Sequence, residues 1–414
     1  MPGMNTELQS RFELVCYGCG AAWSISGPTT CTACGEPMSP RPVGDVPADV
    51  FREPPGSLWA YRDLLPVASE DVVSLGEGAT PLLEAPRLAA SFGIGALTLK
   101  NEMVNPTGSF KDRQVCVGLN HAREIGAETV AVVSSGNVAC AASAYAARAG
   151  MRAVLLMHGH AAPGKLVQAA VYGGHALRVE SPSAQAVFEL CIEACATFGW
   201  YHLSTAGIYE PYNVEGAKTI AYELFFQTNG DLPDWVVAPV GGGGLLGGIW
   251  RGFLDLQRLG LIERPPRLVG VQASGCAPLK KAIDNGTAFL DTLKDPWKDP
   301  HTVAGGIADD ILFDGHTVLP AIRSTNGAAI AVDDDAILDG ARTLAVQEGL
   351  WCEPTCAVVI AALEQLEAGP DDRVCCVLTG NGIKDPAALQ SRITPAVTVE
   401  PTLDALAKAV GEGA

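Results

Sequence analysis

Short apolar runs alternate with helix-like segments along most of the chain, and this alternation constrains the fold more than any other feature. The runs are rich in valine, leucine and alanine and lie at Thr129–Val133, Ala153–Met157, Trp235–Val240, Leu268–Val271 and Val374–Leu378. Strands that helices bury on both faces have this continuous apolar character. The pattern therefore predicts an α/β protein, and a length of 414 residues favours two parallel-sheet units.

The N-terminal segment contains two Cys-x2-Cys pairs, which have the spacing of a zinc knuckle. Eleven residues separate the pairs, which are Cys16 with Cys19 and Cys31 with Cys34. Four thiolates can close a tetrahedral zinc site, and a segment this short has too small an apolar core to fold by itself. We predict a structural zinc ribbon, with a reduced, metal-free segment as the alternative.

The stretch Asn105–Arg113 joins a predicted strand, Leu97–Lys100, to a predicted helix. Its Asn-Pro-Thr-Gly start is typical of a turn, and Ser109 is expected to cap the helix. Lys111 then lies in the first helical turn, where the positive end of the helix disfavours an ammonium and should lower its pKa. A neutral amine there can form a Schiff base, whereas the alternative is a solvated lysine on an ordinary helix.

Two further segments directly follow predicted strands, at the sheet edge where α/β proteins bind ligands. Four consecutive glycines, Gly241–Gly244, precede a predicted helix, so their N–H groups can surround an anion. The segment Ser134–Gly136 offers hydroxyl and N–H groups that suit a substrate carboxylate, and Asn137 follows it. The alternatives are a flexible glycine linker and an ordinary asparagine N-cap.

Six motifs, taken in chain order, resemble those of threonine synthases, which are fold-type II enzymes dependent on pyridoxal 5'-phosphate (PLP): Glu77–Leu82, Asn105–Arg113, Ser134–Asn137, Glu215–Thr219, Pro239–Gly244 and Thr379–Pro386. Some threonine synthases also carry a similar N-terminal ribbon. The resemblance implies a tryptophan-synthase-β-like fold with two parallel-sheet domains. The expected divisions are 1–40 for the ribbon, 41–108 with 211–392 for the large PLP-binding domain, 109–210 for the small domain and 393–414 for a tail.

The resemblance also implies roles for the site residues. Lys111 would hold the cofactor and act as general base at the α-carbon of the substrate. Asn137 would bond the ring hydroxyl of the cofactor, and the neutral hydroxyl of Thr379 would face its pyridine nitrogen, which favours elimination over long-lived carbanion chemistry. The cofactor phosphate would be held by Gly241, Gly242, Gly243, Gly244 and Leu245, and the substrate by Ser134, Ser135, Gly136 and Asn213.

Several positions depart from the threonine-synthase pattern where the phosphate of the substrate is expected. Val138 stands where a hydroxyl residue is usual, and Glu210-Pro-Tyr-Asn213 replaces an Asn-Pro-x-Arg segment. An arginine is therefore missing and a carboxylate is added, which should weaken the binding of a phosphate dianion. Arg113, Lys165 and Lys218 are the cations in the family motifs that could compensate.

These observations predict an enzyme that eliminates or replaces a group at the β- or γ-carbon of an amino acid. One hypothesis is a threonine synthase acting on O-phosphohomoserine, although we expect this not to be the best substrate. A second is a serine/threonine dehydratase-like lyase or a cysteate-synthase-like β-replacement enzyme. A third is a non-catalytic paralogue, which the presence of Lys111, Asn137 and Thr379 argues against.

The composition bears on partners and location. A net charge of −18 disfavours nucleic acid and anionic membranes as partners. The chain has no run of about 18 apolar residues and no signal-peptide pattern, and its 13 cysteines do not suggest a disulfide scaffold. We expect a cytoplasmic homodimer that acts on a small amino acid. His158 and His160 are expected on a loop face rather than in a base or metal pair.

Overall fold

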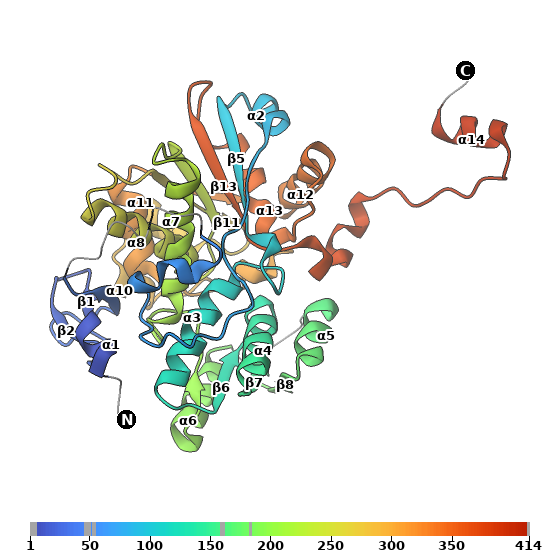
Figure 1. The fold of residues 1–414 in the computed structure, drawn as a ribbon. Coiled ribbons are helices and arrows are strands. Elements are labelled where there is room, and N and C mark those ends of the chain that lie inside the picture. The colour runs from blue at the N-terminus through green and yellow to red at the C-terminus, as the bar shows by residue number, and fades with distance from the viewer. Residues whose placement is uncertain (1–5, 45–50, 52–54, 158–161, 182–183, 412–414) are drawn as a thin grey trace.

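The computed structural model describes residues 6–44, 51, 55–157, 162–181 and 184–411. Within these residues there is one sheet in an N-terminal ribbon and two sheets in an α/β body (Figure 1). The loop predicted at His158 and His160 lies outside the described residues.

The ribbon is a three-stranded antiparallel sheet in the order β2-β1-β3. Its elements are α1 (Thr6–Arg11), β1 (Phe12–Cys16), β2 (Ala22–Ser24) and β3 (Met38–Pro42). It packs against helix α8 (Gly244–Arg258) of the body. The rings of Tyr17 and Trp250 lie 5.8 Å apart, and Arg251 Nη1 donates to Ser39 Oγ at 2.9 Å.

The larger sheet of the body has the strand order β12-β11-β10-β13-β5-β4, and only the edge pair of β4 and β5 is antiparallel. Its strands are β4 (Leu82–Glu84), β5 (Ala96–Asn101), β10 (Trp235–Pro239), β11 (Arg267–Ala273), β12 (Ala328–Val332) and β13 (Arg373–Leu378). Adjacent Cys375 and Cys376 belong to different apolar cores, so the sheet is buried on both faces.

Helices cover both faces of this sheet. One apolar core joins it to α2 (Pro86–Phe92), α12 (Asp334–Glu348) and α13 (Pro354–Ala361). The other core joins it to α7 (Lys218–Gln227), α8 and α11 (Gly315–Ser324). The shorter helices of this half are α9 (Pro278–Asp284), α10 (Phe289–Thr292), and the 3-10 turns η2 (Leu58–Leu64), η3 (Glu102–Val104), η4 (Asn213–Ala217), η5 (Gly305–Ile307), η6 (Ala362–Glu364), η7 (Gly382–Lys384) and η8 (Pro386–Arg392).

The smaller sheet is wholly parallel, in the order β8-β7-β6-β9. Its strands are β6 (Thr129–Val133), β7 (Arg152–Met157), β8 (His175–Arg178) and β9 (Tyr201–His202). One core joins it to α3 (Lys111–Glu124), α4 (Asn137–Ala149) and α5 (Pro163–Val171), and a second core joins it to α6 (Ala184–Phe198). Two parallel-rich sheets between helices confirm the predicted fold class.

The C-terminal segment runs away from the body and ends in α14 (Leu403–Val410), as Figure 1 shows in red. Helix α14 buries none of its side chains, and Leu403 is 84% exposed. Helix α14 therefore adds nothing to the apolar cores described above.

Candidate active site

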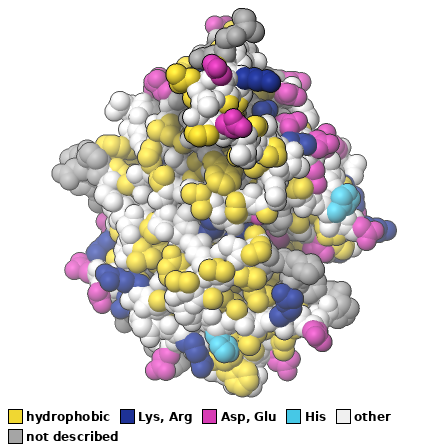
Figure 2. Space-filling view, turned by 90° about the vertical axis from the view of Figure 1, so that its right-hand side faces the viewer, with side chains coloured by type: hydrophobic (Ala, Val, Ile, Leu, Met, Phe, Trp, Pro, Cys, Tyr) yellow, Lys and Arg dark blue, Asp and Glu magenta, His cyan; other side chains and the backbone are white. Residues whose placement is uncertain are grey.

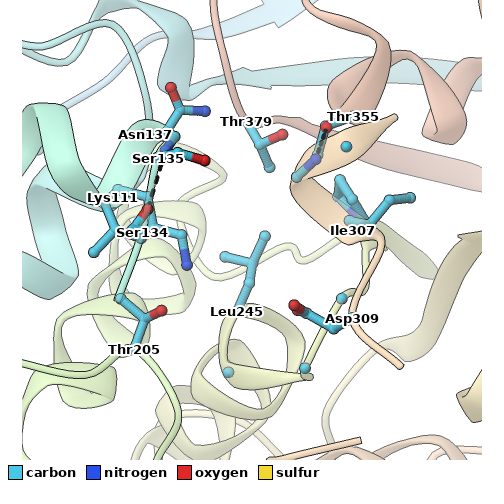
Figure 3. Close-up of a pocket in the computed structure, with 18 of the residues that line it drawn as sticks. Lys111, Ser134, Ser135, Asn137, Thr205, Leu245, Ile307, Asp309, Thr355 and Thr379 are labelled. Carbon is cyan, nitrogen blue, oxygen red and sulfur yellow. Dashed lines mark hydrogen bonds between the residues drawn. The ribbon is translucent and has the colours of Figure 1, made fainter. Parts of the chain in front are cut away.

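A cavity of about 430 Å³ lies where β6, β10 and β13 end, between the two sheets of the body. Its lining includes all the residues predicted to hold the cofactor and three of the four predicted to hold the substrate: Lys111, Ser134, Ser135, Gly136, Asn137, Gly241, Gly242, Gly243, Gly244, Leu245 and Thr379. Figure 3 shows Lys111 and Ser134 on one side of this cavity, opposite Ile307 and Asp309.

The turn before Lys111 approaches the end of β13. Ser109 forms an isolated antiparallel bridge with Gly380, and the Phe110 N–H donates to the Thr379 carbonyl at 3.0 Å. The expected Ser109 cap is wrong, because Phe110 occupies the N-cap position and the helix begins at Lys111. The bridge instead holds Lys111 and Thr379 at the same edge of the cavity.

The surroundings of Lys111 favour the neutral form of its amine. Lys111 Nζ donates to Gln114 Oε1 at 3.0 Å and lies 4.6 Å from the centroid of the Phe110 ring. Burial lowers the pKa of Lys111 to about 8, although the carboxylates of Asp309 and Asp314 act in the opposite direction. A pKa near 8 leaves a useful fraction of the amine neutral and nucleophilic at physiological pH.

The glycine loop follows β10 and opens helix α8. Gly243 adopts a left-handed φ of 108°, which glycine reaches without strain. A Cβ on Gly241 would lie 2.4 Å from Asp309 Oδ2, and one on Gly244 would lie 3.0 Å from the Thr205 carbonyl oxygen. Side chains are therefore excluded here, and the loop presents backbone N–H groups and a helix N-terminus to the cavity.

Asn137 begins helix α4, with Gly136 at the N-cap position, so the alternative of an asparagine N-cap is wrong. Asn137 Nδ2 donates to Glu353 Oε1 at 2.6 Å, and the other oxygen of Glu353 lies 2.7 Å from Lys165 Nζ. Ser134 Oγ accepts from the Gly136 N–H at 3.1 Å, which shapes the loop between β6 and α4.

Several lining residues that the structure describes have buried polar atoms without a hydrogen-bond partner, and two of these atoms belong to residues predicted to hold the cofactor. Asn137 Oδ1 and Thr379 Oγ1 have no hydrogen-bond partner within the described part of the chain. Buried polar groups are normally hydrogen-bonded, so such orphans mark places where a ligand supplies the partner. Together with the glycine loop and the Lys111 amine, they fit an aromatic aldehyde that carries a phosphate and ring heteroatoms, as PLP does.

Asn213 does not reach the cavity. It begins η4, and its Nδ2 donates to the Ser204 carbonyl at 2.8 Å, while its backbone N–H donates to Glu210 Oε2 at 2.6 Å. The Glu210 carboxyl also accepts from Tyr201, and burial raises its pKa to about 8. The expected repulsion of a substrate phosphate by Glu210 is therefore wrong, because this carboxyl is buried among its own partners.

Sequence reasoning missed four acidic residues that line the cavity: Asp309, Asp314, Glu353 and Asp385. Asp314 Oδ1 accepts from the Gly207 N–H at 2.8 Å, and burial raises the pKa of Asp314 to about 7. Asp309 and Asp314 follow η5 in a segment without regular periodicity. No spacing rule singles out such residues, because tertiary packing alone brings them to the glycine loop.

The four ribbon cysteines come together as predicted. The Sγ atoms of Cys16, Cys19, Cys31 and Cys34 all lie within 4.8 Å of one another. Cys16 Sγ is 3.4 Å from Cys34 Sγ, and Cys19 Sγ is 3.6 Å from Cys31 Sγ. Tetrahedral zinc with bonds of about 2.3 Å places its sulfurs about 3.8 Å apart, so the cluster is compatible with zinc.

Comparison with known proteins agrees with this site. Residues 73–380 match the family described as pyridoxal-phosphate dependent enzyme. The chain belongs to this family of PLP-dependent enzymes.

Within the family, its relatives include threonine synthases. The threonine synthase of Methanocaldococcus jannaschii is 37% identical over 86% of this chain and 87% of its own length. That of Methanosarcina acetivorans is 35% identical over 96% of this chain and 98% of its own. The chain is thus a threonine-synthase-like member of the family, of the kind that carries out elimination or replacement at the β- or γ-carbon of amino acids.

Solved structures with the same fold include maize serine racemase, with a TM-score of 0.63, 23% identity and coverage of 76% of this chain and 91% of that one. The threonine deaminase of T.th. has a TM-score of 0.61 and 27% identity, covering 73% of this chain and 92% of that one.

Proposed function

We propose that this protein is a PLP-dependent lyase in which Lys111 carries the cofactor, and that O-phosphohomoserine is not its best substrate. The fit of the cavity to PLP supports the first part: Asn137 would meet the ring hydroxyl, Thr379 the pyridine nitrogen, and the loop Gly241–Leu245 the phosphate. PLP, when bound, withdraws electrons from the α-carbon of an attached amino acid.

The residues of the chain supply the remaining steps. The N–H and hydroxyl groups of Ser134–Gly136, at the start of α4, would hold the substrate carboxylate and so orient the α-carbon. Lys111, with a pKa of about 8, would accept the proton from that carbon and deliver it to the leaving group or to water. Because Thr379 is neutral, it does not hold a proton on the pyridine nitrogen.

The proposal about the substrate is supported by the charged side chains that line the cavity. Among the described residues that line it, the basic side chains are Lys111 and Lys165, whereas four carboxylates line it. Lys165 is 9% exposed and its ammonium is already paired with Glu353. Even with the pKa of Asp314 raised to about 7, acidic side chains outnumber basic ones in this lining, so Coulomb repulsion opposes the entry of a phosphate dianion.

The other two cations that could have compensated for the missing arginine are paired with carboxylates outside the cavity. Arg113 is fully buried, and its guanidinium pairs with Glu102 and Glu223. Lys218 is 1% exposed and pairs with Glu215 and Asp255. Neither side chain lines the cavity, so neither supports phosphate binding in it.

Kinetics with matched substrates tests the proposal. The PLP-loaded protein would be assayed with L-serine against O-phospho-L-serine, and with L-threonine and O-acetyl-L-serine against O-phosphohomoserine. We expect kcat/KM for the best unphosphorylated amino acid to exceed that for O-phosphohomoserine by about 100-fold, because Lys165, the lining cation besides Lys111, is already paired with Glu353 and gives the phosphate no free charge contact. Efficient conversion of O-phosphohomoserine to threonine contradicts the substrate proposal and supports the second candidate, a threonine synthase proper, which the relatives favour.

We also propose the domain divisions given above: a structural zinc ribbon at 1–40, a large domain at 41–108 and 211–392, a small domain at 109–210 and a tail at 393–414. The four-cysteine cluster supports zinc. A cytoplasmic homodimer is likewise a proposal, which light scattering and cell fractionation would test. None of the described helices is both long enough and apolar enough to cross a membrane.

A further inference from the structure

Asp309 lies directly against the loop that is proposed to hold the cofactor phosphate. Its carboxylate also lies near Gly242, where a Cβ would be 3.6 Å from Oδ2, and the Gly242 N–H lowers the pKa of Asp309. The same carboxylate leaves no room for a side chain on Gly241, since a Cβ there would be 2.4 Å from Oδ2. Figure 3 shows the Asp309 side chain between Leu245 and the right-hand wall of the cavity. A carboxyl group therefore already lies against the loop that an incoming phosphate needs.

We propose that Asp309 competes with the cofactor phosphate for the glycine loop, and that its carboxyl must take up a proton or move away from the loop when the phosphate binds. Asp309 is then a residue that sets the affinity for the cofactor and makes it depend on pH. This inference rests on the PLP site assigned above, but it goes beyond that assignment, because a glycine loop alone would show no competition.

The groups around Asp309 determine the sign of the pH dependence. They are Lys111, Asp310 and Asp314, together with Cys276, whose Sγ donates to the Asp309 carbonyl at 3.2 Å. Burial raises the pKa of Asp309 and Asp310 raises it further, whereas Lys111 lowers it. A phosphate dianion beside the carboxyl raises that pKa again, so binding takes up a proton, and affinity falls as pH rises.

Lys111 contributes a dependence of the opposite sign, because only its neutral amine bonds to the aldehyde of PLP. The two effects are separated by a ligand that has the phosphate but no aldehyde. Pyridoxine 5'-phosphate meets this need, since its attachment requires no neutral lysine. Between pH 7 and 9 its phosphate is already a dianion. Changes in the ring of the ligand and in Lys111 are common to the wild type and Asp309→Asn, so the difference between the two proteins reports on Asp309.

The experiment is a titration of the cofactor-free full-length protein with pyridoxine 5'-phosphate between pH 7 and 9. We expect the dissociation constant of the wild type to rise by about tenfold or more over this range, with a limit of tenfold per pH unit for one proton. Asp309→Asn should bind at least about tenfold more tightly at pH 9 and lose most of the pH dependence, because its amide is neutral and can donate to the phosphate.

Asp310→Asn is the matched control, since Asp310 adjoins Asp309 but does not line the cavity, and it should retain the pH dependence. Equal or weaker binding by Asp309→Asn would mean that the carboxyl only braces the loop, which overturns the proposal. If that variant does not fold, a wild-type affinity that stays constant or rises with pH overturns it equally. Failure of the wild type to form a lysine-bound PLP absorbance band would instead refute the cofactor assignment itself.

Discussion

At the scale of single residues, two residues of one motif have opposite environments. Lys111 faces the cavity with a lowered pKa, whereas Arg113, two residues on, is buried in an ion network with Glu102 and Glu223. Lys100 joins the same network, 2.6 Å from Glu223 Oε2. The network ties α3, α7 and β5 together just behind the site, so one motif supplies both the reactive amine and its support.

Removing one member of this network should strongly destabilise the folded protein. Glu223→Ala leaves two cations buried without their main partner, and we expect the free energy of unfolding to fall by about 3–5 kcal/mol. Urea unfolding at pH 7 measures the loss. Asp71→Ala is the control, because its pair with Arg123 is exposed, and a change of less than about 1 kcal/mol is expected there. Similar small losses in both variants would show that the network adds little.

The same carboxylate predicts a pH dependence of stability. Arg113 and Lys100 hold the pKa of Glu223 at about 2, below its ordinary 4.5, despite the opposing effect of burial. A depressed pKa contributes stability that is present above about pH 4.5 and lost as pH falls toward 2. Unfolding followed from pH 5 to pH 2 should show a steeper loss for the wild type than for Glu223→Gln. Parallel curves would contradict this assignment.

At the scale of elements, helix α8 links the ribbon to the site. Its N-terminus carries the glycine loop, and Trp250, Arg251 and Arg258 further along contact the ribbon. The motifs allowed the strands, the glycine loop and the cysteine cluster to be predicted, because each depends on local sequence. The docking of the ribbon on α8, the position of Asp309 and the inward turn of Asn213 depend on contacts between distant segments, for which the sequence has no local signal.

Removing zinc tests whether PLP binding depends on the fold of the ribbon. We expect about one equivalent of zinc per chain, held by Cys16, Cys19, Cys31 and Cys34, and loss of the ribbon fold on chelation. PLP should be retained, because Leu245 lies six residues, or about 9 Å along the helix, from Arg251. Elemental analysis and visible absorbance measure the two results. Cys191→Ser, which alters a cysteine of α6, should bind zinc normally. Loss of the PLP band on chelation would show that α8 transmits the change.

At the scale of the whole molecule, the cavity is closed by contacts between its two halves. Asn137 on α4 and Lys165 on α5 both bind Glu353, which precedes α13 of the larger sheet. Exposed apolar side chains are spread over the face seen in Figure 2. Val167 and Val171 of α5 are also exposed. The described part of the tail, residues 393–411, contributes no residue to the lining of the cavity.

Truncation after Arg392 should therefore leave the body unchanged. Because α14 buries none of its side chains, we expect the melting temperature to shift by less than about 2 °C and PLP binding to persist. Calorimetry measures the melting temperature and visible absorbance measures PLP binding. Light scattering compares the molar mass before and after truncation. A fall in molar mass would show that the tail joins subunits, which this account does not predict.

The central claim is that Lys111, and no other lysine, carries PLP, and it can be tested by borohydride reduction of the PLP-loaded protein followed by peptide mass mapping. Lys165 is the natural internal comparison, because it is the other lysine among the described residues that line the cavity. We predict a single pyridoxyl label on the peptide that contains Lys111, and no label or turnover in a folded Lys111→Ala variant. A label on Lys165 or on any other lysine, or no label at all, would contradict the account.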